Sequence, residues 1–77
     1  MIKQTCLVYF VNCTTGEIIK VQATTYNISS VISYAKQRLH KKGIDVTGYK
    51  TAVYILDYLI KQGLPIPTDE TILKTVM

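Results

Sequence analysis

Residues 6–25 have the sequence CLVYFVNCTTGEIIKVQATT, and this stretch decides the fold. Over residues 6–12 the side chains are apolar, aromatic or β-branched with hardly a break, which is typical of a strand. A second strand is expected over residues 17–25, where apolar side chains alternate with a more polar set. Thr14, Thr15 and Gly16 lie between the two strands. The pattern therefore predicts a β-hairpin with a three-residue loop, in which Gly16 adopts the left-handed conformation.

The expected register pairs Val11 with Ile19 and Tyr9 with Val21. One face of the hairpin is then entirely apolar or aromatic and consists of Leu7, Tyr9, Val11, Ile19, Val21 and Ala23. The opposite face is mixed and consists of Cys6, Val8, Phe10, Ile18, Lys20, Gln22 and Thr24. Because an isolated hairpin is not stable, we expect helices to cover the first face. Phe10 would then be exposed on the second face, unless a helix, a second copy of the chain or a partner covers it.

Three helices are expected after the hairpin. Asn27 is a good N-cap for a helix over about residues 28–42, and Gly43 is a good residue to end it. One apolar stripe of this helix consists of Ile28, Val31, Ile32, Ala35 and Leu39. Thr47 is expected to cap a second and more apolar helix over about residues 48–62, which Gly63 ends.

The segment 64–67 contains two prolines and is expected to be an extended connector. Thr68 is expected to cap a short final helix, with Asp69 and Glu70 in its first turn, where the helix dipole favours negative charge. The sequence therefore predicts an α+β fold. An antiparallel β-hairpin is followed by two amphipathic helices and a short C-terminal helix (β-β-α-α-α), in one small globular domain over residues 1–77.

Length and composition exclude several classes of protein. A chain of 77 residues has no room for a two-domain enzyme or a dinucleotide-binding fold. Nine Lys and Arg against five Asp and Glu give a net charge of +4, which permits an anionic partner without requiring one. The apolar run over residues 6–11 is too short for a secretory signal or a membrane span, so no membrane association is expected.

Cys6 and Cys13 lie seven positions apart, so on one strand they would be about 23 Å apart and could not form a disulfide. We expect two reduced thiols and a cytoplasmic location, which is the host cytoplasm if the protein is viral. Neither cysteine is flanked by the residues of a known nucleophile turn. The single histidine, His40, lies near a helix end, where a cation complements the helix dipole.

No catalytic residues, metal ligands or cofactor are expected. No two non-adjacent carboxylates share a helix face, and Asp57 is expected to form a surface ion pair with Lys61, four residues later. The four glycines stand singly, so no phosphate-binding loop is present in the sequence. We therefore expect a protein that is not an enzyme.

The expected helix over residues 48–62 carries Tyr54 and Tyr58 on its polar side. The two rings could pack on the second hairpin face, contact another molecule or be exposed; tyrosine is enriched at binding hot spots. The candidate partner-binding residues are Tyr54, Tyr58, Lys50, Lys61, Phe10 and Ile18. We expect a non-enzymatic protein-binding module, and a homo-oligomer built on the Phe10 face is a further hypothesis.

Lysine outnumbers arginine eight to one, and isoleucine and threonine are abundant. Such usage suggests an A+T-rich genome. The most concrete form of the hypothesis is a phage or mobile-element protein that binds and inhibits a host or defence protein.

A transcriptional regulator that binds nucleic acid is the alternative. Its candidate residues are Lys36, Arg38, Lys41, Lys42 and Lys50. The four on the first expected helix form a ring around its C-terminal end and not a stripe, which the helix dipole explains equally well.

Overall fold

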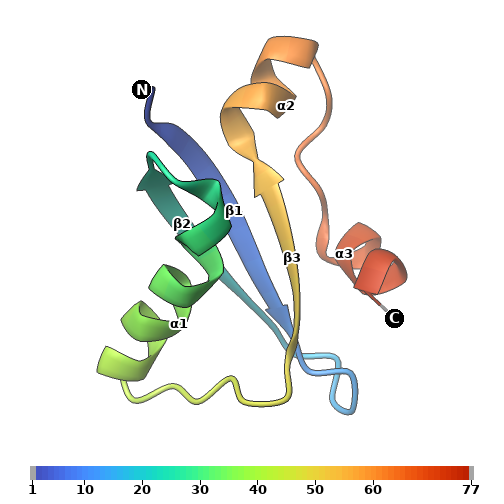
Figure 1. Cartoon of the computed structure of the whole chain (residues 1–77). Helices are drawn as coiled ribbons and strands as arrows, with labels where there is room; N and C mark the ends of the chain where they lie inside the picture. Colours follow the sequence, from blue (N-terminus) through green and yellow to red (C-terminus); the bar gives the residue numbers. More distant parts are fainter. Residues whose placement is uncertain (1, 77) are drawn as a thin grey trace.

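The computed structural model describes residues 2–76, and a three-stranded antiparallel sheet lies at the centre of the molecule (Figure 1). The middle strand is β1 (Gln4–Val11), with β2 (Ile18–Thr25) on one side and β3 (Lys50–Ile55) on the other. The helices α1 (Val31–Lys41) and α3 (Asp69–Val76) pack on opposite faces of the sheet, and α2 (Leu56–Gln62) follows β3 directly. The α+β class and the hairpin with helices after it are confirmed.

The register of the β1–β2 hairpin differs from the expected one by one residue. Val11 pairs with Ile18 and not with Ile19, and the loop has four residues, 13–16, instead of three. The reason lies in Asn12, whose Oδ1 accepts hydrogen bonds from the N–H groups of Thr14 and Thr15 at 2.9 and 3.2 Å. This side-chain turn bends the chain one residue earlier than expected. Gly16 does adopt the left-handed conformation, with φ 79°.

A one-residue slip changes which side chains share a face of the sheet. Cys6, Val8 and Phe10 now lie on the same face as Ile19, Val21 and Ala23. The opposite face carries Leu7, Tyr9 and Val11 together with Ile18. β1 is therefore apolar on both faces, which suits a strand that is buried on both sides.

The expected helix over residues 48–62 is wrong in its first half, because residues 50–55 form the third strand, β3. Gly48 has φ 83°, which a helix does not allow at its start. Thr47 does not cap a helix; its N–H and Oγ1 both donate to Asp45 Oδ1, at 2.9 and 2.6 Å. Every second residue of β3 is β-branched, and the strand pairs antiparallel with β1 from Val11–Lys50 to Cys6–Ile55.

The ends of the other helices match the sequence. Asn27 Oδ1 accepts from the Ser29 N–H at 3.1 Å and caps a 3-10 turn, Ile28–Ser30, that leads into α1. Gly43, with φ 80°, follows the end of α1, and the next N–H, of Ile44, donates back to Leu39 O at 2.9 Å. Thr68 Oγ1 accepts from the Thr71 N–H at 3.2 Å and caps α3.

Two separate clusters of side chains form the core. The α1 core lies between α1 and one face of the sheet, and its buried members are Cys6, Val8, Phe10, Val21, Ala23, Val31, Ala35, Leu39 and Val46. The α3 core lies on the other face, and its buried members are Leu7, Tyr9, Val11 and Ile72. Phe10 was expected to be exposed unless a helix, a second copy or a partner covered it; it is 0% exposed because the helix α1 covers it.

Candidate functional site

β3 is an edge strand, and its outer edge carries unpaired backbone groups. Residues of an antiparallel strand direct their N–H and C=O groups alternately to one neighbour and to the other. The N–H of Asn12, next after β1, donates toward the β2 side, to Glu17 O at 2.9 Å, so odd-numbered residues of β1 face β3. Their partners are Lys50, Ala52 and Tyr54. The backbone groups of Thr51 and Val53 therefore point away from the sheet, and residues 2–76 supply no other backbone partner for them.

A groove of about 630 Å³ runs beside this strand, and residues 49–54 together with Thr75 and Val76 line it. The end of α3 forms its second wall, and Lys50 Nζ donates to Val76 O at 3.4 Å. At the start of the strand the Tyr49 hydroxyl donates to Glu17 Oε1 at 2.6 Å. This hydrogen bond to a carboxylate raises the pKa of Tyr49, because it stabilises the protonated phenol. These two contacts fix the end of the groove that lies at the start of β3.

Tyr54 and Tyr58 do not form the expected pair on one helix. Tyr54 is on β3, and its half-buried ring packs in the α3 core against Tyr9, with ring centroids 5.8 Å apart and planes at 83°. Tyr58 is on α2 and is 55% exposed. Tyr54 therefore packs inside the protein, whereas Tyr58 is exposed.

The remaining candidates for partner contact are also separated. Phe10 is buried, and Ile18 is half-buried beside the α3 core, so neither forms the exposed apolar face that the sequence suggested. Lys50 lies at the start of β3, whereas Lys61 is exposed on α2. Asp57 was expected to pair with Lys61, but its Oδ2 accepts from the Thr5 N–H at 2.8 Å and so holds α2 against the start of β1.

A second feature that sequence reasoning missed is the apolar surface of α2 and the segment after it. No residue of α2 is buried. Exposed apolar side chains in this part of the chain are Tyr58, Ile60, Leu64 and Ile66. The alternation of β-branched residues over residues 51–55, directly after Gly48, was the signal that could have identified the strand.

The five candidate residues for nucleic-acid binding do not form one surface. Arg38 is held at the β2 edge, where its Nη1 donates to Gln22 O at 3.0 Å and its guanidinium lies 5.9 Å from the ring of Tyr34. Lys50 is on β3 and contacts the end of α3. Lys36, Lys41 and Lys42 remain exposed on or next to α1.

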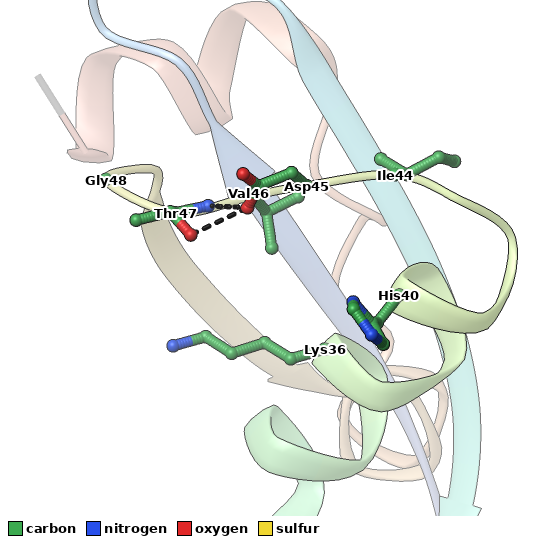
Figure 2. Close-up of a pocket in the computed structure, with 7 residues that line it drawn as sticks. All are labelled: Lys36, His40, Ile44, Asp45, Val46, Thr47 and Gly48. Carbon is green, nitrogen blue, oxygen red and sulfur yellow. Dashed lines mark hydrogen bonds between the residues drawn. The ribbon is translucent and has the colours of Figure 1, made fainter.

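Lys36 and His40 project from α1 toward the loop 44–48, and together they line a shallow hollow of about 310 Å³ (Figure 2). Asp45 lies in this loop, and its two hydrogen bonds from Thr47 lower the pKa of its carboxyl, with a smaller contribution from the charge of His40. The carboxylate is therefore held by its own loop. Within residues 2–76 no three His, Cys, Asp or Glu side chains are arranged to hold a metal ion.

The thiol of Cys6 has no access to solvent, because Cys6 is fully buried in the α1 core. Burial raises the pKa of this thiol, which disfavours the nucleophilic thiolate. Cys13 lies in the hairpin loop and is half-buried. In the described chain neither cysteine is in a disulfide.

Comparisons with known protein families, with curated proteins and with solved structures gave no match for this chain. In the part of the chain that the structure describes, no helix has the length and apolar character needed to cross a bilayer. The groove beside β3 and the exposed apolar surface of α2 are the features that bear on function.

Proposed function

We propose that the chain is a non-enzymatic protein-binding module that contacts its partner through β3, α2 and the segment that follows α2. The observation that carries this proposal is the free outer edge of β3 beside an open groove. Unpaired strand edges are ready templates for contact with another polypeptide. The exposed apolar side chains of α2 and its following segment add contact area next to it.

The nucleic-acid alternative has less support from the geometry, because Arg38 is held at the β2 edge and Lys50 lies on β3, away from the lysines of α1. A protein that reads phosphates by charge needs its cations on one surface. The narrower hypothesis of a phage or mobile-element protein that inhibits a host or defence protein is supported by length and residue usage alone.

Site-specific photocrosslinking in cells tests the proposed surface. A photoreactive residue placed at Thr51, on the β3 edge, is expected to form adducts with protein that survive nuclease treatment. The matched control is the same residue at Thr24, on the β2 edge, and a third position, Lys36, reports on the basic side of α1. Adducts at Lys36 that nuclease removes, with none at Thr51, would establish the nucleic-acid function instead.

A further inference from the structure

We propose that the groove beside β3 binds an extended segment of a partner polypeptide, which joins the sheet as a fourth strand and carries an acidic residue next to Lys50. This inference rests on the proposed function and specifies its mode of recognition. It depends on four features: the backbone of β3, the length of the groove, the contrast with β2, and the charge of the lining.

The backbone of β3 supplies the hydrogen bonds that a fourth strand requires. Thr51 and Val53 direct their N–H and C=O groups outward, and residues of one orientation repeat at about 6.8 Å along a strand. An extended peptide has the same repeat, so each outward-facing residue can exchange two hydrogen bonds with it. Main-chain pairing of this kind supplies affinity, and alternate side chains supply specificity.

The groove has the dimensions of one strand. Its lining includes six consecutive residues, 49–54, which correspond to about 20 Å of extended chain. The end of α3, with Thr75 and Val76, forms the other wall, so one side of an added strand would be covered. A neighbouring strand lies about 4.8 Å from its partner, so an added strand would run along this open groove, with Thr75 and Val76 on one side of it.

The other edge of the sheet is protected, and this directs pairing to β3. Along β2 the exposed residues that alternate with the core are Lys20, Gln22 and Thr24. Arg38 lies over this edge and occupies the carbonyl of Gln22 at 3.0 Å. Charged side chains and covered carbonyls are the usual protection of edge strands. β3, like β2, has one charged residue, Lys50 at its first position, but among the described residues no side chain donates to the outward carbonyls of Thr51 and Val53.

The side chains of the groove define the chemistry of the segment. Ala52 and Tyr54 lie on the same face of β3 as Lys50 and belong to the surroundings of the α3 core, so apolar side chains suit the positions opposite them. Lys50 is the one charged side chain among the described residues that line the groove, and no carboxylate is among them. An acidic side chain opposite Lys50 therefore has a favourable partner at close range.

The same charge argues against a second copy of this chain as the occupant. A β3–β3 pair would bring another Lys50 and no carboxylate from the strand into the groove, between two chains that each carry a net charge of +4. An acidic segment of a different protein removes this repulsion and neutralises Lys50. The proposal therefore commits to an extended acidic peptide.

Selection from a randomised peptide library displayed on phage, with the full chain immobilised, tests the proposal. Library members of about ten residues cover the whole groove at roughly 3.4 Å per residue. Enriched peptides are expected to alternate apolar residues and to hold Asp or Glu at one position. Amide exchange should then show new protection at Thr51 and Val53 when such a peptide is bound.

Two matched threonine-to-proline variants locate the pairing. Thr51→Pro removes an outward N–H of β3 and is expected to weaken the selected peptide about tenfold or more, since it also blocks close approach of a strand. Thr24→Pro makes the same change on the β2 edge and should alter the affinity less than about twofold. Lys50→Glu is expected to reverse the preference between an acidic peptide and its lysine counterpart. Should Thr51→Pro fail to fold, a peptide N-methylated at the facing residue supplies the same test on the unmodified chain.

Several results would overturn the proposal. Failure to enrich any peptide, enriched peptides that lack an acidic position, or equal effects of Thr51→Pro and Thr24→Pro would each exclude acidic strand addition at β3. Dimers of the free chain that Thr51→Pro disrupts would assign the edge to a second copy. If protein crosslinks at Thr51 persist while no peptide binds, the protein-binding function stands and this mode of recognition is wrong.

Discussion

The segments before and after Thr47 contribute very unequally to the core. Among residues 2–76, all buried hydrophobic residues except Ile72 precede Thr47. The later segment holds β3, α2 and α3, and its exposed apolar side chains include Tyr58 and Ile60. The first segment thus supplies most of the stability, whereas the second supplies the free strand edge and the accessible apolar surface. Binding surfaces are drawn from the less stable parts of a fold, and the surface that we propose for partner binding lies in such a part.

The largest loss of stability is expected from Phe10→Ala, in the segment that supplies most of the core. Phe10 is fully buried in the α1 core, so its truncation should lower the free energy of unfolding by about 3–5 kcal/mol. A loss of that size approaches the total stability of a small domain. Urea denaturation followed by circular dichroism measures it. Tyr58→Ala, an exposed aromatic of the second segment, is the control and should change stability by less than about 0.5 kcal/mol.

Ile72→Ala is expected to lower the free energy of unfolding by about 2–4 kcal/mol, the next largest effect. It should weaken the packing only on the face of the sheet that α3 covers. Ile72 is the buried residue of α3, whereas Leu73 and Val76 are half-buried beside it. Its loss should release α3 before the hairpin opens. Amide exchange is expected to show lost protection in α3 and β3 with protection retained in β1 and β2. Uniform loss over the whole chain would mean that the two segments unfold as one unit.

Gly43→Ala and Gly63→Ala compare the two segments at equivalent helix ends. Both glycines have positive φ, 80° and 67°. A Cβ added at either position would meet no atom within 4 Å, so the expected loss of stability comes from the backbone conformation alone. Each substitution should cost about 1–2 kcal/mol locally. For Gly43→Ala, at the end of α1, we expect this whole amount to appear as a decrease in the free energy of unfolding of the protein. For Gly63→Ala we expect a smaller decrease, because α2 has no buried residue. Equal losses would contradict the weaker attachment of α2.

The smallest expected effect is a loss of stability that occurs only in alkali. Burial, with a smaller contribution from the charge of Asp69, raises the pKa of Tyr9 above its unfolded value of about 10. The folded state favours the neutral phenol, so this contribution to stability is complete below about pH 10 and is lost as pH rises through the folded pKa. Unfolding measured between pH 8 and roughly 12 should show this decline, and Tyr9→Phe should reduce its slope. An unchanged slope would exclude Tyr9 as its source.

Local signals in the sequence predicted the features that depend on neighbouring residues. The caps at Asn27 and Thr68, the helix ends at Gly43 and Gly63, and the apolar stripe of α1 are all present. Each of these depends on hydrogen bonds or periodicity within a few residues, so the chain specifies them without reference to the rest of the fold.

The candidate site beside β3 could be predicted only in part. Lys50 and Tyr54 were among the expected contact residues and do line the groove, but they were assigned to a helix. Phe10 was placed on the wrong face because the hairpin register was off by one residue, and that register depends on the side-chain turn of Asn12. The apolar pattern alone does not fix the register, since the apolar residues of β1 suit both faces.

The sequence by itself determined the hairpin, the first and last helices and their ends, because short-range hydrogen bonds and apolar periodicity specify them. Only the tertiary structure decided that residues 50–55 are a strand. This stretch carries apolar residues at helical as well as strand spacing, and pairing with the second side of β1 decides between the two. The free edge, and with it the candidate binding site, is therefore a consequence of a contact between segments about 45 residues apart in the chain.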